Sequence, residues 1–392
     1  MVKLTLTGNH CVAYAVKLSR VKVVSAYPIT PQTTIVEKLS EMVDSGDADI
    51  KMIRVESEHS ALSAVYGAAT AGVRAFTATS SHGLLYMHEM VWWTAQARVP
   101  LVMAVVTRTI GPPWNIWTDH HDIMGQRDTG WLIVMAETNQ EVLDETIKLF
   151  RITEDPRVFL PGMVGLDAFI LSHTVEPVEV PEQEVVDSFL PERRQPYTIR
   201  FGDPLIMGNI PSDLLLNAKM RWDVHEALGR STQVIDEVDR EWGKLTGRYY
   251  GGLVECYRCE DADFLFIGAG AWVGDMRLAI DKLRDMGYRF GVLKVRYIRP
   301  FPGARILEIA RGKKGVVVLD RSISAGSAGP IFLDLAAYFQ GKNVTIPIKN
   351  VVAGLAGFDV NYEDFVKIGE RFVNEVSEVG WVENHLEFYP LR

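Results

Sequence analysis

Short apolar runs alternate with segments of helical periodicity through the first 180 residues of the chain. Val21–Ala26 and Leu101–Val106 have the length and the β-branched content of buried strands. A helix is predicted from about Pro31, because apolar residues between Ile35 and Val43 recur at the spacing of one helical face. Repeated alternation of this kind predicts βαβ units and a mostly parallel sheet.

A second unit of the same type follows a break in the pattern. Five prolines between residues 181 and 211 indicate a connector, and a long charged helix is predicted from roughly Arg221 to Thr246. Strand-like runs return at 264–267, 291–295 and 315–319. We therefore predict the α/β class with two domains and mostly parallel sheets: residues 1–250, with a connector at about 181–250, and residues 251–392.

Composition narrows the class of protein. The 392 residues are 47% hydrophobic and 23% charged, which is typical of a soluble globular protein. A net charge of −9 without a basic cluster argues against nucleic acid or an anionic membrane as partner. No apolar run reaches the roughly 18 residues of a membrane span. Three cysteines are too few for a disulfide framework or an iron–sulfur cluster. We expect a cytoplasmic location.

Polar residues that could do chemistry follow four of the predicted strands. They are Thr30, Glu58, the turn Ser80–Gly83 and Arg108. In an open parallel sheet the carboxyl ends of the strands face one crevice, and ligands bind there. We therefore predict that a hydroxyl, a carboxylate and a guanidinium converge on one pocket.

Thr30 and Glu58 each have a structural explanation as well. Pro31 suits the first position of a helix, so Thr30 would be the N-cap and its hydroxyl would cap that helix. Glu58 would interact with the dipole of the helix that follows it. A stripe of small residues between Ala61 and Ala71 would let a helix or a second subunit pack closely and bury this carboxylate.

Arg108 follows the predicted strand Leu101–Val106, at the end of the sheet where a ligand would lie. Arginine suits bidentate binding of a carboxylate or phosphate. The alternative is an ion pair with Asp119 or Asp122 in the next loop. That loop, residues 111–131, is long and rich in aromatic residues. Long irregular loops in compact domains are commonly functional.

Two further patterns could indicate cofactors. Gly268–Gly274 follows a predicted strand, but its spacing is G-x-G-x-x-x-G and no acidic residue ends the next strand. Tight strand-to-helix packing is favoured over dinucleotide binding, and a non-catalytic NAD-binding or assembly subunit stays open as the alternative class. The histidines have no HExxH or cysteine–histidine spacing, so we expect no metal ligands in this chain.

Taken together, the motifs resemble the alpha subunit of the 2-oxoacid:ferredoxin oxidoreductase family. The resemblance covers nearly the whole chain and rests on Tyr27-Pro-Ile-Thr-Pro-Gln32, Val55-Glu-Ser-Glu-His-Ser-Ala61, Gln126-Arg-Asp-Thr-Gly-Trp131 and Arg299-Pro-Phe-Pro302. It implies a thiamine diphosphate pyrimidine-binding domain followed by a transketolase C-terminal-like domain.

The resemblance also implies a heteromeric enzyme. Its members convert a 2-oxoacid, coenzyme A and oxidised ferredoxin to acyl-CoA, carbon dioxide and reduced ferredoxin. A beta subunit binds the diphosphate and Mg and carries a [4Fe-4S] cluster, a gamma subunit engages coenzyme A, and a delta subunit holds further clusters. This division agrees with the chain itself, which has no Gly-Asp-Gly segment followed by paired asparagines to hold a metal-bound diphosphate.

Site residues follow from the resemblance by position. Glu58 matches the glutamate that hydrogen-bonds the aminopyrimidine ring and thereby promotes loss of the thiazolium C2 proton. Thr30 and Arg108 match residues that hold the carboxylate and keto oxygen of the substrate, and Pro28 and Ile29 would shape the wall beside the cofactor. The segment 114–122 resembles the pyruvate enzymes, which we favour. Pro-Pro-Trp at 112–114 is closer to relatives that act on branched-chain 2-oxoisovalerate, which stays the alternative substrate.

Overall fold

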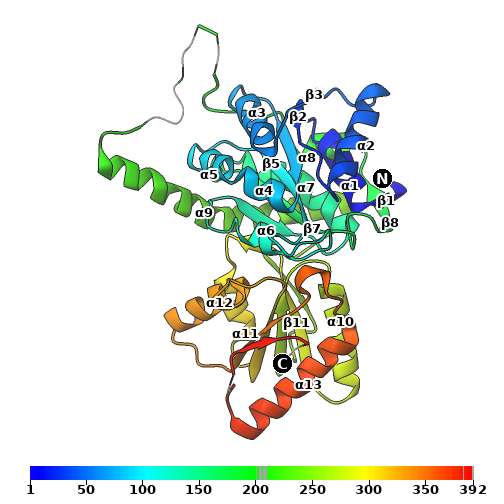
Figure 1. Cartoon of the computed structure of the whole chain (residues 1–392), viewed down its shortest axis with the longest axis vertical. Helices are drawn as coiled ribbons and strands as arrows, with labels where there is room; N and C mark the ends of the chain where they lie inside the picture. Colours follow the sequence, from blue (N-terminus) through cyan, green and yellow to red (C-terminus); the bar gives the residue numbers. More distant parts are fainter. Residues whose placement is uncertain (200, 203–204, 206–209, 383, 391–392) are drawn as a thin grey trace.

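Two mostly parallel sheets lie one above the other along the long axis of the molecule (Figure 1). The structure is a computed structural model that describes residues 1–199, 201–202, 205, 210–382 and 384–390. The N-terminal sheet and its helices form the upper half of the view, and the C-terminal sheet forms the lower half. Both sheets are flanked by helices, and the predicted α/β class with mostly parallel sheets is confirmed.

The first sheet has seven strands in the order β12-β6-β7-β5-β4-β2-β3. Six come from the first 167 residues and run parallel: β2 (Val23–Ser25), β3 (Lys51–Ile53), β4 (Ala75–Thr79), β5 (Val102–Thr107), β6 (Leu132–Met135) and β7 (Gly162–Asp167). Its helices are α1 (Gly8–Leu18), α2 (Thr33–Asp44), α3 (Glu58–Thr70), α4 (Ser81–Tyr86), α5 (His88–Gln96), α6 (His121–Met124) and α7 (Asn139–Thr153). Beside it, β1 (Val2–Thr7) and β8 (Val175–Val180) form an antiparallel ribbon.

The second sheet has six strands in the order β15-β14-β13-β10-β11-β9. They are β9 (Val254–Tyr257), β10 (Phe264–Gly268), β11 (Phe290–Val295), β13 (Gly315–Asp320), β14 (Ile348–Val352) and β15 (Leu386–Phe388), and only β9 is antiparallel to its neighbour. Its helices are α10 (Val273–Asp285), α11 (Gly303–Ala310), α12 (Pro330–Gly341) and α13 (Tyr362–Val379), with a short 3-10 turn at Leu355–Gly357.

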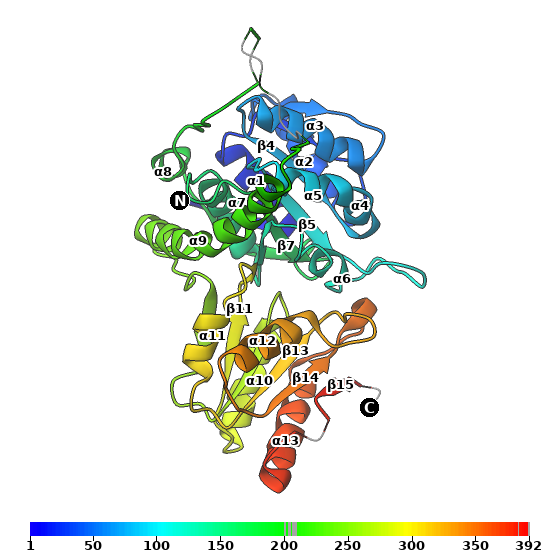
Figure 2. The same cartoon turned by 90° about the vertical axis from the view of Figure 1, so that its left-hand side faces the viewer.

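The connector between the sheets contains two helices, α8 (Gln183–Phe189) and α9 (Leu214–Thr246). Helix α9 begins seven residues earlier than predicted, because the Asp213 carboxylate accepts the backbone N–H groups of Leu215 and Leu216 and caps it. It ends at Gly247, whose φ of 78° is left-handed. Its N-terminal end projects from the body of the molecule at the left of Figure 1, the side that faces the viewer in Figure 2. Residues 200, 203–204 and 206–209 of the predicted connector lie outside the described residues.

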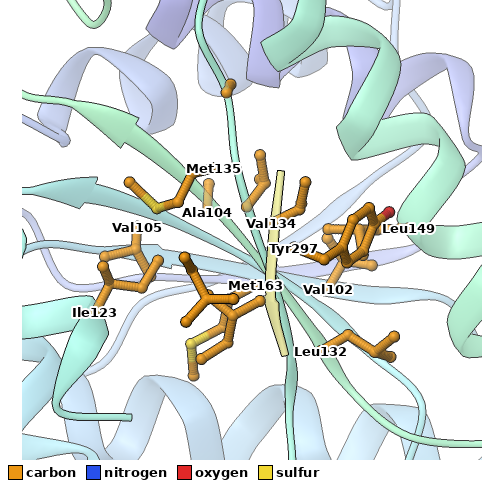
Figure 3. Packing of buried hydrophobic residues seen from close by; sticks show 14 of the residues in the cluster. Val102, Ala104, Val105, Ile123, Leu132, Val134, Met135, Leu149, Met163 and Tyr297 are labelled. Carbon is orange, nitrogen blue, oxygen red and sulfur yellow. The ribbon is translucent and has the colours of Figure 1, made fainter. Parts of the chain in front are cut away.

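Strands β5, β6 and β7 form the centre of the main hydrophobic core. Val102, Leu132 and Met163 from these strands pack together with Leu149 of α7 (Figure 3). Tyr297 belongs to the same cluster and comes from β12 (Tyr297–Arg299). This strand lies in the second half of the sequence but pairs antiparallel with β6 of the first sheet. The edge strand β12 of the first sheet therefore begins more than a hundred residues after the end of β7, the preceding strand of that sheet in the sequence. Among the described residues, no helix is both long and apolar enough to cross a membrane.

Candidate active site

The segment after β2 is a turn, and Thr30 lies at its exposed tip. The prediction that Thr30 caps α2 is wrong, because the helix begins at Thr33 with Gln32 in the N-cap position. The Gln32 N–H instead donates to the Ile29 carbonyl at 2.8 Å, across the cis peptide bond before Pro31. The hydroxyl of Thr30 is thus free of a capping role.

Buried Asn9 on α1 holds this turn from behind. Its Nδ2 donates to the Pro31 carbonyl and to the Thr34 hydroxyl, both at 2.7 Å. Pro28 is exposed and lines an open groove along α2, while Ile29 is half-buried. The two residues predicted to shape the cofactor wall therefore lie on a turn that the rest of the fold fixes in place.

Arg108 directly follows β5, and its guanidinium reaches the same turn. Nη1 donates to the Thr30 carbonyl at 2.6 Å and Nε donates to the Asn115 carbonyl at 3.2 Å. The Trp114 ring lies over the guanidinium, 5.0 Å away. Burial lowers the pKa of Arg108, although Asp122 opposes the shift, and arginine stays charged at such values. Within the described part of the chain, the guanidinium forms no ion pair, and Nη2 has no hydrogen-bond partner.

Fully buried Asp122 joins two of the predicted strand ends. Its Oδ2 accepts the backbone N–H of Ser81 at 2.8 Å and that of Arg108 at 3.0 Å. The predicted alternative of an Arg108–Asp122 pair is thus a backbone contact. Burial raises the pKa of Asp122 to about 7. The carboxylate fixes the Ser80–Gly83 turn against the end of β5, so these strand ends move as one unit.

Glu58 is the first residue of α3, with Ser57 as its N-cap. The side chain is 8% exposed, so it is buried by this chain alone and needs no partner subunit for that. It lies against α4 and the end of β4: a methyl group built on Gly83 would stand 2.6 Å from Glu58 Oε1 and 2.6 Å from the Thr79 hydroxyl. No hydrogen bond to the Glu58 carboxylate occurs among the described residues.

The small-residue stripe on α3 is buried at Ala61, which is 0% exposed, and is exposed at Gly67 and Ala71. A methyl group on Gly67 would meet nothing within 4 Å. Helices α4 and α5 pack on α3, and Glu58 is buried against α4, so burial by a helix, one of the two predicted alternatives, occurs within this chain.

The glycine segment after β10 contacts the first sheet. Gly270 has a φ of 88°, and the N–H of Ala271 donates to Asp167 Oδ2 at 2.7 Å. His120 and Arg321 also contact Asp167. Burial would raise the pKa of Asp167, but the contacts with His120 and Arg321 hold it well below its usual range. A carboxylate of the protein thus occupies the place where a dinucleotide fingerprint would bind phosphate, which agrees with the packing interpretation.

Three carboxylates come close enough to suggest a metal site, at Glu137, Glu141 and Glu255. Lys294 lies among them, with Nζ 2.8, 2.5 and 3.3 Å from the three side chains, and Arg277 contacts two of them. The ammonium group takes the position of a cation, so this cluster is an ionic contact between the two sheets.

Sequence reasoning found Thr30, Glu58 and Arg108, which the structure brings to adjoining strand ends. It named Asp122 only as a possible ion-pair partner of Arg108, and it missed Asn9, whose partners lie in another element. The only signal for Gly83 was a glycine in a Ser-Ser-His-Gly turn. These residues hold the candidate site in shape.

Comparison with known proteins places the chain among 2-oxoacid oxidoreductases. The family model "Pyruvate flavodoxin/ferredoxin oxidoreductase, thiamine diP-bdg" matches residues 14–240, and "Pyruvate:ferredoxin oxidoreductase core domain II" matches residues 262–365. The chain is 43% identical to the ketoisovalerate oxidoreductase subunit VorA of Pyrococcus abyssi, covering 100% of this chain and 98% of the relative. It is 42% identical to the pyruvate synthase subunit PorA of Pyrococcus furiosus, with the same coverage.

Solved structures agree on the fold. A 2-oxoglutarate:ferredoxin oxidoreductase from Magnetococcus marinus superimposes with a TM-score of 0.71 at 17% identity, over 94% of this chain and 65% of that longer chain. A split-gene transketolase superimposes with a TM-score of 0.56 at 11% identity, over 94% of this chain and 98% of the other. The family models and the relatives in sequence show that this chain belongs to the pyruvate flavodoxin/ferredoxin oxidoreductase family, as an alpha-type subunit of a 2-oxoacid:ferredoxin oxidoreductase.

Proposed function

We propose that the chain is the alpha subunit of a pyruvate:ferredoxin oxidoreductase and contributes half of a thiamine diphosphate site. The observation that carries the proposal is the contact series running from Glu58 through the Ser80–Gly83 turn and Asp122 to Arg108 and Thr30. It joins a buried carboxylate and an arginine with an unused donor at the carboxyl ends of neighbouring strands.

The residues present fit the aminopyrimidine half of the cofactor. The Glu58 carboxylate accepts no hydrogen bond among the described residues, so it can share a proton with a ring nitrogen. Thiamine diphosphate, when bound, supplies the nucleophilic carbon and the electron sink for decarboxylation of a 2-oxoacid. Pro28 and Ile29 would contact the cofactor from the turn after β2. The pyrimidine-binding part would be residues 1–250, and the transketolase C-terminal-like part residues 251–392.

Arg108 and Thr30 would hold the substrate. Nη2 of Arg108 is the donor left over after the Thr30 and Asn115 carbonyls are bound, so it can take a carboxylate oxygen. The exposed hydroxyl of Thr30 can donate to the keto oxygen. With the guanidinium fixed by two carbonyls, its orientation is set before the substrate arrives.

The remaining groups would come from partner subunits. In this proposal a beta subunit supplies the diphosphate and Mg half of the site and a [4Fe-4S] cluster. Gamma and delta subunits supply coenzyme A binding and further clusters, and ferredoxin takes the electrons. We place the complex in the cytoplasm.

Branched-chain 2-oxoacids are the second candidate substrates, because the relatives at 43% and 42% identity are named for ketoisovalerate and pyruvate respectively. Reduction of methyl viologen by the co-purified complex with coenzyme A distinguishes them. Pyruvate is expected to give a higher kcat/KM than 2-oxoisovalerate or 2-oxoglutarate, and the reverse order would assign the chain to the branched-chain enzymes.

Replacement of Glu58 tests the cofactor role. Glu58→Gln should lower 2-oxoacid oxidation by the complex by about 10²- to 10⁴-fold, because general acid–base contributions have this size. Glu56→Gln is the matched control, since Glu56 is exposed two residues earlier and accepts the Ser60 hydroxyl. Normal turnover by Glu58→Gln would refute the proposal.

A further inference from the structure

The carboxylate of Glu58 rests in a space that exists only because residue 83 has no side chain. A methyl group on Gly83 would stand 2.6 Å from Glu58 Oε1 and 2.9 Å from Glu58 Cγ. Real Cβ atoms essentially never make such contacts, so the two groups exclude one another. Gly83 itself is buried and its N–H donates to the Ser80 carbonyl at 2.9 Å, which fixes its position.

The Thr79 hydroxyl faces the same space. It also lies 2.6 Å from the position that a methyl group on Gly83 would take, so it is a near neighbour of Glu58 Oε1. Thr79 is fully buried at the end of β4, and its Oγ1 has no hydrogen-bond partner in the described part of the protein. A buried donor without a partner destabilises the fold unless a ligand-dependent state satisfies it.

We propose that Gly83 and Thr79 are positioning residues that seat the Glu58 carboxylate for proton sharing with the aminopyrimidine ring, an inference that rests on the proposed function. Gly83 leaves the room in which the inner oxygen, Oε1, lies. Thr79 donates its hydroxyl proton to Oε1 when the outer oxygen turns to the ring. The carboxyl group is then held at both ends, so its direction is fixed.

The nature of the contact separates this role from ordinary packing. The atoms that a methyl group on residue 83 meets belong to the end of the Glu58 side chain and to one hydroxyl, and no backbone atom is among the three nearest. In the proposed arrangement the Glu58 side chain rotates away, because both of its crowded atoms, Oε1 and Cγ, lie beyond Cβ. An alanine at position 83 is therefore expected to displace the Glu58 carboxylate and to leave the fold unchanged. The aminopyrimidine ring would then lose the carboxylate with which it shares a proton.

The test compares Gly83→Ala with Gly67→Ala in the assembled complex. Gly67 lies on α3, the helix that begins at Glu58, and a methyl group there meets nothing within 4 Å. Exchange of the C2 hydrogen of bound thiamine diphosphate for deuterium, followed by NMR after acid quench, reports the proton chemistry before any substrate binds. Gly83→Ala should slow this exchange by roughly 10- to 100-fold, since misplacement of about 1 Å has effects of this size. Gly67→Ala should leave it unchanged.

A double-mutant cycle on thermal unfolding of the cofactor-free complex gives a second measurement. Gly83→Ala should lower the Tm in the wild-type background and should lower it less in the Glu58→Ala background, where the carboxylate is gone. Equal losses in both backgrounds would overturn the proposal. The complex carrying Gly83→Ala alone could fail to assemble. Assembly restored by adding Glu58→Ala would then support the positioning role of Gly83, and failure in both backgrounds would overturn it.

Thr79 is tested by Thr79→Val and Thr79→Ser, which differ in the hydroxyl. Exchange should slow in the valine variant and stay near the wild-type rate in the serine variant. If the C2 hydrogen exchanges at the wild-type rate in both Thr79→Val and Gly83→Ala but slowly in Glu58→Gln, the positioning role of Thr79 and Gly83 is refuted and the proposed function stands. Wild-type exchange in Glu58→Gln would refute the proposed function itself.

Discussion

Two regions of the molecule hold buried charges, and they use them differently. Where the two sheets meet, Lys148 lies 2.6 Å from both Glu145 and Asp239, and Arg296 pairs with Glu145. All four side chains are almost fully buried, and two positive charges face two negative ones. Burial would raise the pKa of Glu145, but Arg296 and Lys148 lower it to about 2.

At the strand ends the charges are incompletely matched. Arg108 is 5% exposed, donates to two carbonyls and forms no ion pair among the described residues. Glu58 is 8% exposed, and its carboxylate accepts no hydrogen bond in that part of the chain. Buried charges are normally paired, so a charge with unused bonding capacity indicates a ligand that completes it. Under the proposed function, completeness of pairing, more than burial, distinguishes the structural charges of the network from Arg108 and Glu58.

The largest expected effect comes from breaking the ionic network. Lys148→Met should lower the free energy of unfolding of the isolated chain by about 3–5 kcal/mol, because it leaves Glu145 and Asp239 with too little positive charge. Urea unfolding measures the loss. Lys22→Met is the control, since Lys22 lies at the same 2.6 Å from Asp49 but in an exposed pair, where about 0–1 kcal/mol is expected. Similar losses in the two variants would mean that burial does not strengthen the network.

Acid should weaken the same network. The pKa of Glu145 is lowered in the folded chain to about 2 from an ordinary 4.5, so the folded state binds fewer protons than the unfolded state in this window. Its contribution, about 3 kcal/mol by linkage, is present above about pH 4.5 and is lost as pH falls toward 2. Unfolding free energies measured across this range should fall less steeply in Glu145→Gln. An unchanged slope would assign the acid sensitivity to other groups.

Replacement of Arg108, in contrast to replacements in the ionic network, should lower kcat/KM and not the free energy of unfolding. Arg108→Ala should lower kcat/KM of the complex for its 2-oxoacid by about 2–3 kcal/mol, as expected for a truncated charge contact. Arg108→Lys keeps the charge without the planar fork and should recover only part of it. Unchanged saturation by the 2-oxoacid in Arg108→Ala would remove the carboxylate role and leave Arg108 as a link between the Thr30 and Asn115 carbonyls.

Local features of this fold were predictable from the sequence, and contacts between distant segments were not. The predicted run Leu101–Val106 forms β5 at Val102–Thr107, one residue later at each end, because a short buried run rich in valine suffices to define a strand. In helix α7 the charges at Glu145 and Lys148 resemble those of solvent-exposed positions in a sequence, but their partners lie as far as 151 residues away. Strand β12 was missed for the same reason.

In the candidate site the chemical groups were predictable and their support was not. Thr30, Glu58 and Arg108 each end a strand-like run, which is a local signal. The capping role predicted for Thr30 was wrong because the chain turns at Pro31 before the helix starts. Gly83 is required by the carboxylate of Glu58, 25 residues earlier, so no local pattern contains that requirement.

The smallest expected effect is that of a substitution at Gly270. The neighbouring Asp167 carboxylate is fully paired, like the carboxylates of the ionic network. Gly270→Ala should lower the free energy of unfolding by about 1–2 kcal/mol, because a left-handed φ of 88° disfavours a side chain, and a methyl group would stand 2.8 Å from Asp167 Oδ2. The kcat of the complex should not change, because Asp167 already has His120, Arg321 and the Ala271 N–H as partners. A large loss of kcat at unchanged stability would mean that this segment binds a cofactor after all, and that full pairing does not mark a charge as structural.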